Sequence, residues 1–168
     1  MTYYGPRRAY RRTNIGPTYA DLLTATDENG ENRSYMASEK NFMMLQEMES
    51  KNLIIPLVGD FAGDKALPRV ARYLTEHDTK VTTFYLSNVE QYLFEQNTWK
   101  KFYSNMKNLP VEDSGMLIRS VFARQAIDRV FSDKSAAQSL QLLGSFQETL
   151  RAYDAGEIRV YEDILHLP

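Results

Sequence analysis

The sequence predicts an α/β domain with a mainly parallel sheet, because apolar runs of strand length alternate with segments of helical periodicity. Residues 53–58 form a continuous apolar run, typical of a strand buried on both faces of a parallel sheet. Residues 80–86 form a second run, rich in β-branched and aromatic side chains. Between them, apolar residues recur at helical spacing: Leu67, Val70, Ala71 and Leu74. This order predicts a right-handed crossover between parallel neighbours.

The domain is expected to begin at residue 38. Residues 1–37 contain several Gly-Pro and Asn-Gly turn signals and are expected to be an irregular lead-in. Ser38 precedes apolar residues at helical spacing, so it is the expected N-cap of a helix that ends near Lys51. We assign residues 38–168 to the domain.

Further elements are expected toward the C-terminus. One more helix is indicated by an apolar stripe of Trp99, Phe102, Tyr103 and Met106. Residues 115–122 are the expected third strand, and residues 135–153 a long final helix ending near Gly156.

Two prolines constrain these elements. Pro56 cannot donate to a sheet, so it places the strand at 53–58 near an edge or turns its missing donor to an unpaired side. Pro68 must lie in the first turn of its helix, where a lost donor does no harm.

Two acids follow the first two predicted strands. Asp60 and Glu90 are expected at neighbouring carboxyl ends, where ligands of parallel sheets bind, and paired acids there would act as a general base or hold a divalent cation. The alternative is structural: Asp60 lies in a turn, and Glu90 completes an S-x-x-E capping box with Ser87. That alternative is favoured and predicts that Glu90→Gln costs little stability.

Other chemistries are poorly matched. The turn from Gly59 to Lys65 contains glycines and a lysine, as a phosphate-binding P-loop does. However, it lacks the spacing of a P-loop and contains two acids, which would repel phosphate. Turn geometry therefore explains its glycines better than phosphate binding does. His77 and His166 are far apart in the sequence and lack metal-ligand spacing, so no metal site with histidine ligands is predicted. A serine hydrolase is disfavoured because the chain has no G-x-S-x-G elbow.

Composition limits the class of protein. The chain has no cysteine, which excludes disulfides and thiolate chemistry and suits a reducing compartment. We read no signal peptide and no membrane span, so a cytoplasmic location is expected. The net charge of −2 gives no general attraction to nucleic acid. Four arginines between residues 7 and 12 are interpreted as a solvated lead-in rather than a nucleic-acid arm.

Four blocks of sequence carry a resemblance to a known family: Pro17 to Leu22, Arg33 to Glu39, Asn52 to Gly63 and Phe84 to Leu93. From about Pro17 onward the chain resembles the C-terminal half of a family of uncharacterised bacterial proteins with a fold similar to S-adenosylmethionine-dependent methyltransferases. The resemblance implies a partial Rossmann-like, methyltransferase-type, three-layer sandwich. It implies substrate-facing residues in the turns after the strands: Gly59, Phe61, Gly63, Ser87 and Asn88.

Two function classes follow from the resemblance. In the first, the chain contributes the substrate side of an S-adenosylmethionine-dependent methyl-transfer site, with Asp60 and Glu90 as its acids. The glycine-rich turn that would bind the cofactor is missing from the sequence, so the cofactor of this chain is unknown. In the second, the chain is a non-catalytic module that pairs with another chain through an open sheet edge. With three expected strands, an apolar edge near residues 53–58 is expected to drive dimerisation or binding of a missing N-terminal half.

Overall fold

The computed structural model describes residues 18–27, 29–122 and 139–167. Contacts divide the chain into two compact units, the first ending at Pro56 and the second beginning at Leu57. Each unit is described separately below.

The described part of the first unit contains two helices, α1 (Tyr19–Thr24) and α2 (Glu39–Ser50). Helix α1 begins with a capping box, because Thr18 and Asp21 each accept the other's backbone N–H. The predicted N-cap of α2 is confirmed: the Ser38 hydroxyl accepts the N–H of Asn41 at 3.2 Å.

The predicted strand at residues 53–58 is wrong. This segment has no regular secondary structure, and all six of its side chains are exposed. Within it only the N–H of Leu53 forms a backbone hydrogen bond to a described residue, the carbonyl of Met48 at 2.9 Å. A strand exists only where its backbone groups are paired, and the apolar pattern alone does not supply a partner. The predicted pairing of 53–58 beside 80–86 is therefore absent from the sheet.

The second unit contains four α-helices, three strands and a 3₁₀ helix among its described residues. In chain order they are α3 (Ala66–Glu76), β1 (Val81–Ser87), α4 (Val89–Glu95), α5 (Trp99–Met106), β2 (Val111–Phe122), β3 (Ser139–Ser145), α7 (Phe146–Asp154) and the 3₁₀ helix η1 (Tyr161–His166). The helix predicted around Leu67 is confirmed as α3, with Pro68 in its first turn. All four residues of the predicted stripe in α5 are buried.

The sheet is mixed rather than mainly parallel. Its order is β1-β2-β3; β1 pairs with β2 in parallel, and β2 pairs with β3 antiparallel. The predicted strand at 115–122 is confirmed within the longer β2. The antiparallel neighbour arises because residues 139–145 form a strand, so the single helix predicted at 135–153 is wrong; residues 135–138 lie outside the described part.

The start of α7 at Phe146 has a local cause. Ser145 ends β3 and caps α7, its hydroxyl accepting the N–H of Glu148 at 3.3 Å. A serine followed three residues later by glutamate is an N-terminal signal, and it stands directly after Gly144. The helix therefore starts at Phe146.

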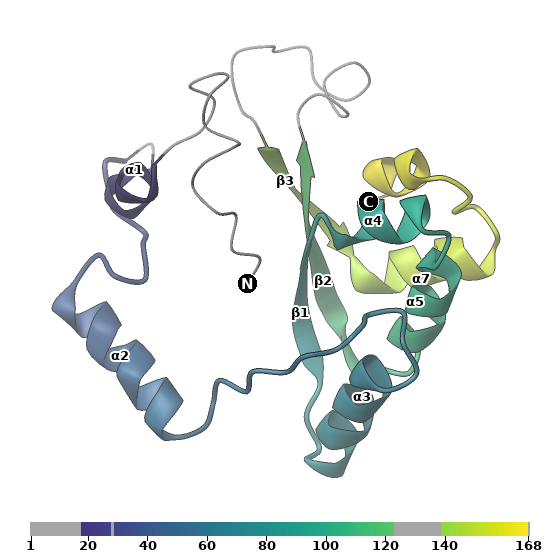
Figure 1. Ribbon diagram of the computed structural model, residues 1–168, viewed down its shortest axis with the longest axis horizontal. Coiled ribbons are helices and arrows are strands. Elements are labelled where there is room, and N and C mark those ends of the chain that lie inside the picture. Colours follow the sequence, from purple (N-terminus) through teal and green to yellow (C-terminus); the bar gives the residue numbers. More distant parts are fainter. Residues whose placement is uncertain (1–17, 28, 123–138, 168) are drawn as a thin grey trace. The chain divides into compact units, whose positions relative to one another are not determined.

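The core lies between the sheet and the helices that pack on one of its faces (Figure 1). Phe84 of β1 stacks on Phe146 of α7 at a centroid distance of 6.4 Å and meets Phe102 of α5 edge-on at 6.4 Å. On the opposite face, Tyr85 and Leu143 are 58% and 65% exposed. The second unit thus buries one face of its sheet and leaves apolar residues on the other. Within the described residues, no helix is long and apolar enough to cross a membrane.

Candidate functional site

A hollow of about 420 Å³ lies beside the loop that leads into α3. We call it the loop pocket. Its wall is formed by the loop and the first turn of the helix: Leu57, Val58, Gly59, Asp60, Gly63, Asp64, Lys65, Ala66 and Arg69. Three residues predicted for the site, Gly59, Asp60 and Gly63, therefore meet at one cavity.

The two glycines of the loop pocket allow close approaches within the loop. A Cβ on Gly59 would lie 2.4 Å from the Cβ of Ala66, and one on Gly63 would lie 3.1 Å from the Cβ of Asp60. The N–H of Gly63 donates to the carbonyl of Asp60 at 3.1 Å, closing the turn. Turn geometry accounts for both glycines without a ligand.

Asn105 holds this loop against α5. Its buried amide Nδ2 donates to the carbonyl oxygens of Phe61 at 3.1 Å and Gly63 at 2.8 Å. Asn105 is not among the site residues predicted from the sequence. Asn105 follows Phe102 by three positions, so a polar side chain on the apolar face of the helix was the signal that was available.

The loop pocket carries both signs of charge. The Asp60 carboxylate accepts the N–H of Ala62 at 2.9 Å, as in an Asx turn. Asp64 forms an ion pair with Lys101 at 2.6 Å, and this hydrogen bond and charge lower the pKa of Asp64. Among the described residues, Lys65 and Arg69 form no ion pair. One carboxylate and two cations therefore remain available at the wall.

The other predicted substrate-facing residues lie elsewhere. Phe61 turns into the aromatic core, with its ring 6.2 Å from Phe84 and 6.1 Å from Phe102. Ser87 is the last residue of β1 and has a φ of 52°, a conformation that non-glycine residues seldom adopt. Asn88 is the N-cap of α4 and makes no capping hydrogen bond with its side chain.

The predicted capping box of Ser87 and Glu90 is wrong. Glu90 is 2% exposed and points into the core, where its Oε2 accepts the Nε–H of Arg119 at 2.7 Å. The hydroxyl of Tyr103 donates to Glu90 Oε1 at 2.5 Å. Arg119 Nη2 contacts Glu90 Oε1 and Thr149 Oγ1, each at 3.3 Å. The carboxylate is occupied by partners from α5 and β2, so it does not cap α4.

This buried network shifts the pKa of its members. Burial, followed by the charge of Glu90, raises the pKa of the Tyr103 phenol well above its ordinary value. Burial alone would lower the pKa of Arg119, but the charge and hydrogen bonds of Glu90 outweigh it and raise the pKa. Tyr161 of η1 has its pKa raised to about 12, by burial and then by the charge of Glu90. The environment around Glu90 and Arg119 thus raises the pKa of both phenols, those of Tyr103 and Tyr161.

The two predicted acids do not form a pair. Asp60 lies at the exposed wall of the loop pocket, whereas Glu90 is sealed beneath β2 and α5. Among the described residues, no hydrogen bond joins them and no group of three or more histidines, cysteines or acids is placed to hold a metal ion. Of the two, only Asp60 is accessible to a ligand.

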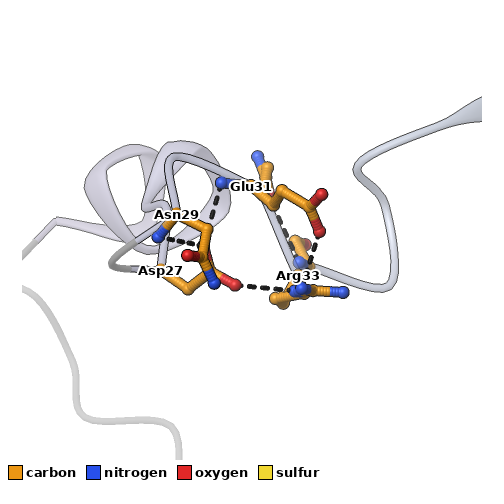
Figure 2. Close-up of polar contacts among 6 residues, drawn as sticks. Asp27, Asn29, Glu31 and Arg33 are labelled. Atoms are coloured by element: carbon orange, nitrogen blue, oxygen red, sulfur yellow. Dashed lines mark hydrogen bonds and ion pairs between the residues drawn. The ribbon is translucent and has the colours of Figure 1, made fainter.

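A separate polar cluster lies in the loop after α1 (Figure 2). Asp27 accepts the N–H groups of Asn29 at 2.9 Å and Glu31 at 3.0 Å, and its second oxygen pairs with Arg33 at 2.9 Å. The hydrogen bond from Glu31, followed by the one from Arg33, lowers the pKa of Asp27. Because the carboxylate is satisfied by its own loop, we interpret this cluster as a stabilised turn.

Comparison with known proteins gives a family without an assigned activity. No curated protein matches the chain. A family model described as a domain of unknown function, DUF7790, matches residues 8–162, which include both the loop pocket and the buried network. The chain therefore belongs to the DUF7790 family.

Proposed function

We propose that the chain is the substrate-side portion of a methyltransferase-like domain and that its loop pocket binds a small polar ligand. The observation that carries this proposal is the meeting of Gly59, Asp60 and Gly63 at one cavity. A volume of about 420 Å³ lies within the range of small-molecule sites. The methyltransferase-like part of the proposal comes from the sequence resemblance.

Asp60 is the acid to which we assign the chemistry. One of its oxygens is held by the N–H of Ala62, which fixes the carboxylate at the wall. A carboxylate held in this way orients a hydroxyl or amine of a ligand and accepts its proton. Glu90 has no such role in the proposal, because its oxygens are bound to Arg119 and Tyr103.

The charges of the loop pocket favour a ligand that carries both signs. Lys65 and Arg69 offer positive charge from the first turn of α3, and Asp60 offers negative charge from the loop. Asp64 adds little net charge because Lys101 neutralises it. S-adenosylmethionine and its product S-adenosylhomocysteine carry a carboxylate and an ammonium group, so they are suitable probes.

Calorimetric titration with these two probes tests the proposal on the purified chain. We expect binding by the native chain and at least tenfold weaker binding by Asp60→Asn and Arg69→Ala, about the loss of one charged contact. The matched control is Arg72→Ala, on the same helix, whose side chain pairs with Glu76 and does not line the pocket. The proposal is wrong if neither probe binds, or if the pocket variants bind as tightly as the control.

A second candidate function is the binding of another protein chain. It is favoured by the free edge of β1, which pairs with β2 on one side only in the described sheet. Unpaired strand edges add strands from other chains. Light scattering at increasing protein concentration tests whether the chain itself associates, and a monomer at every concentration would remove self-association from this candidate.

A further inference from the structure

We propose that two copies of this chain form a symmetric dimer in which residues 53–58 of each copy add a strand to the free edge of β1 of the other. This proposal rests on the second candidate function above and names the partner. Two features of the chain support it: the outer edge of β1 and the segment 53–58. In the described structure, neither of them pairs with another strand.

The first feature is the edge of β1 (Val81–Ser87). Natural edge strands are usually guarded by charged side chains, by proline or by a covering element. β1 contains no charged residue and no proline. Thr83 and Tyr85 are exposed along it, and no described strand pairs with its outer side. The edge is therefore open to strand addition.

The second feature is the segment 53–58. It carries four aliphatic side chains between 42% and 68% exposed, and Val58 is fully exposed. The backbone groups of residues 54–58 make no hydrogen bond to the described residues. The segment has no charge, and its one proline removes a single donor. It has the composition of a strand that lacks a sheet.

If residues 53–58 paired with β1, the unpaired backbone groups of both segments would form hydrogen bonds. A strand added to β1 gains main-chain hydrogen bonds, and its aliphatic side chains cover apolar surface. Neither partner brings a charge into the contact, so no charge is desolvated. Each copy carries one edge and one segment, so a two-fold dimer uses all four and leaves neither edge open.

The absence of native cysteine makes a disulfide test unambiguous. One chain carries Ile55→Cys, and a second chain, made larger by a tag, carries Thr83→Cys. Because the register of the added strand is not fixed in advance, a third chain carries Tyr85→Cys, two residues further along the same face of β1. After mixing and mild oxidation, we expect a disulfide between the two different chains. The alternative is that residues 53–58 pair with β1 of their own chain. A single chain that carries both Ile55→Cys and Thr83→Cys tests it, and a disulfide that closes within a monomer would overturn the proposal.

Light scattering of charge variants provides a test that does not depend on register. We expect a dimer for the native chain and a dissociation constant raised about tenfold or more by Ile55→Lys and by Thr83→Lys, because each places a charge in the apolar contact. Both positions are exposed, so folding is preserved. The matched control is Leu143→Lys, which changes an exposed residue of β3 on the open face of the sheet. A monomeric native chain, or a dimer weakened only by Leu143→Lys, would refute strand exchange. A dimer without the mixed disulfide would refute it too, while leaving self-association intact.

Discussion

The carboxylate of Glu90 and the guanidinium of Arg119 meet at 2.7 Å inside the core, although the two residues are 29 positions apart. Each side chain is 3% exposed. Tyr103 and Thr149 supply the neighbouring hydrogen bonds, so the pair joins α4, β2, α5 and α7. A charge in this position is tolerated only because its partner is present.

Glu90→Gln is expected to destabilise the second unit by about 3 to 5 kcal/mol, because the neutral amide leaves the charge of Arg119 buried and unpaired. Urea denaturation measures this change. The control is Glu148→Gln, which removes an exposed ion pair with Arg151 and should cost under about 1 kcal/mol. The double variant Glu90→Gln with Arg119→Met should recover part of the loss. A cost for Glu90→Gln no larger than that of the control would mean that the pair contributes little.

The two serine and glutamate patterns of the chain should respond differently to mutation. Ser145→Ala is expected to cost about 1 kcal/mol, because the Ser145 hydroxyl caps α7. Ser87→Gly is expected to be neutral or stabilising by up to about 1 kcal/mol, because glycine relieves the φ of 52°. Thermal and denaturant melts compare the two variants. A larger loss from Ser87→Gly than from Ser145→Ala would contradict the assignment of the caps.

Stability should fall at alkaline pH because of Tyr161. Its pKa is raised from 10.0 to about 12 in the folded chain, so the folded state keeps the phenol protonated where the unfolded state releases its proton. The contribution of the protonated Tyr161 phenol to the free energy of unfolding is therefore complete below pH 10 and is lost as the pH rises toward 12. Denaturant midpoints measured across this range should decline, and Tyr161→Phe should make the decline shallower. An unchanged slope in Tyr161→Phe would contradict the prediction.

Asn105→Ala is expected to loosen the loop pocket. The substitution leaves the carbonyl groups of Phe61 and Gly63 without their donor, which should cost about 1 to 3 kcal/mol. The matched control is Asn108→Ala, because the amide of Asn108 is exposed and bonds only to Ser104 among the described residues. Amide hydrogen exchange in residues 59–65 should accelerate in Asn105→Ala and not in the control. Equal exchange in both variants would show that Asn105 does not hold the loop.

The sequence by itself determined the features that depend on near neighbours. The helical stripes around Leu67 and Trp99 specify α3 and α5, and Ser38 specifies the start of α2, because a helix satisfies its backbone within its own segment. The clustering of Gly59, Asp60 and Gly63 at one pocket was predictable for the same reason: they share one short loop.

Only the tertiary structure decided the features that depend on distant partners. Residues 53–58 have the composition of a strand, yet a strand requires another strand to pair with, and none lies beside them in the described sheet. The patterns of Ser87 with Glu90 and Ser145 with Glu148 look alike in the sequence, but the second caps a helix and the first does not. The side chain of Glu90 points into the core because Arg119 and Tyr103 donate hydrogen bonds to its carboxylate there. The energy of a buried ion pair depends on residues that are distant in the sequence, so no local pattern predicts it.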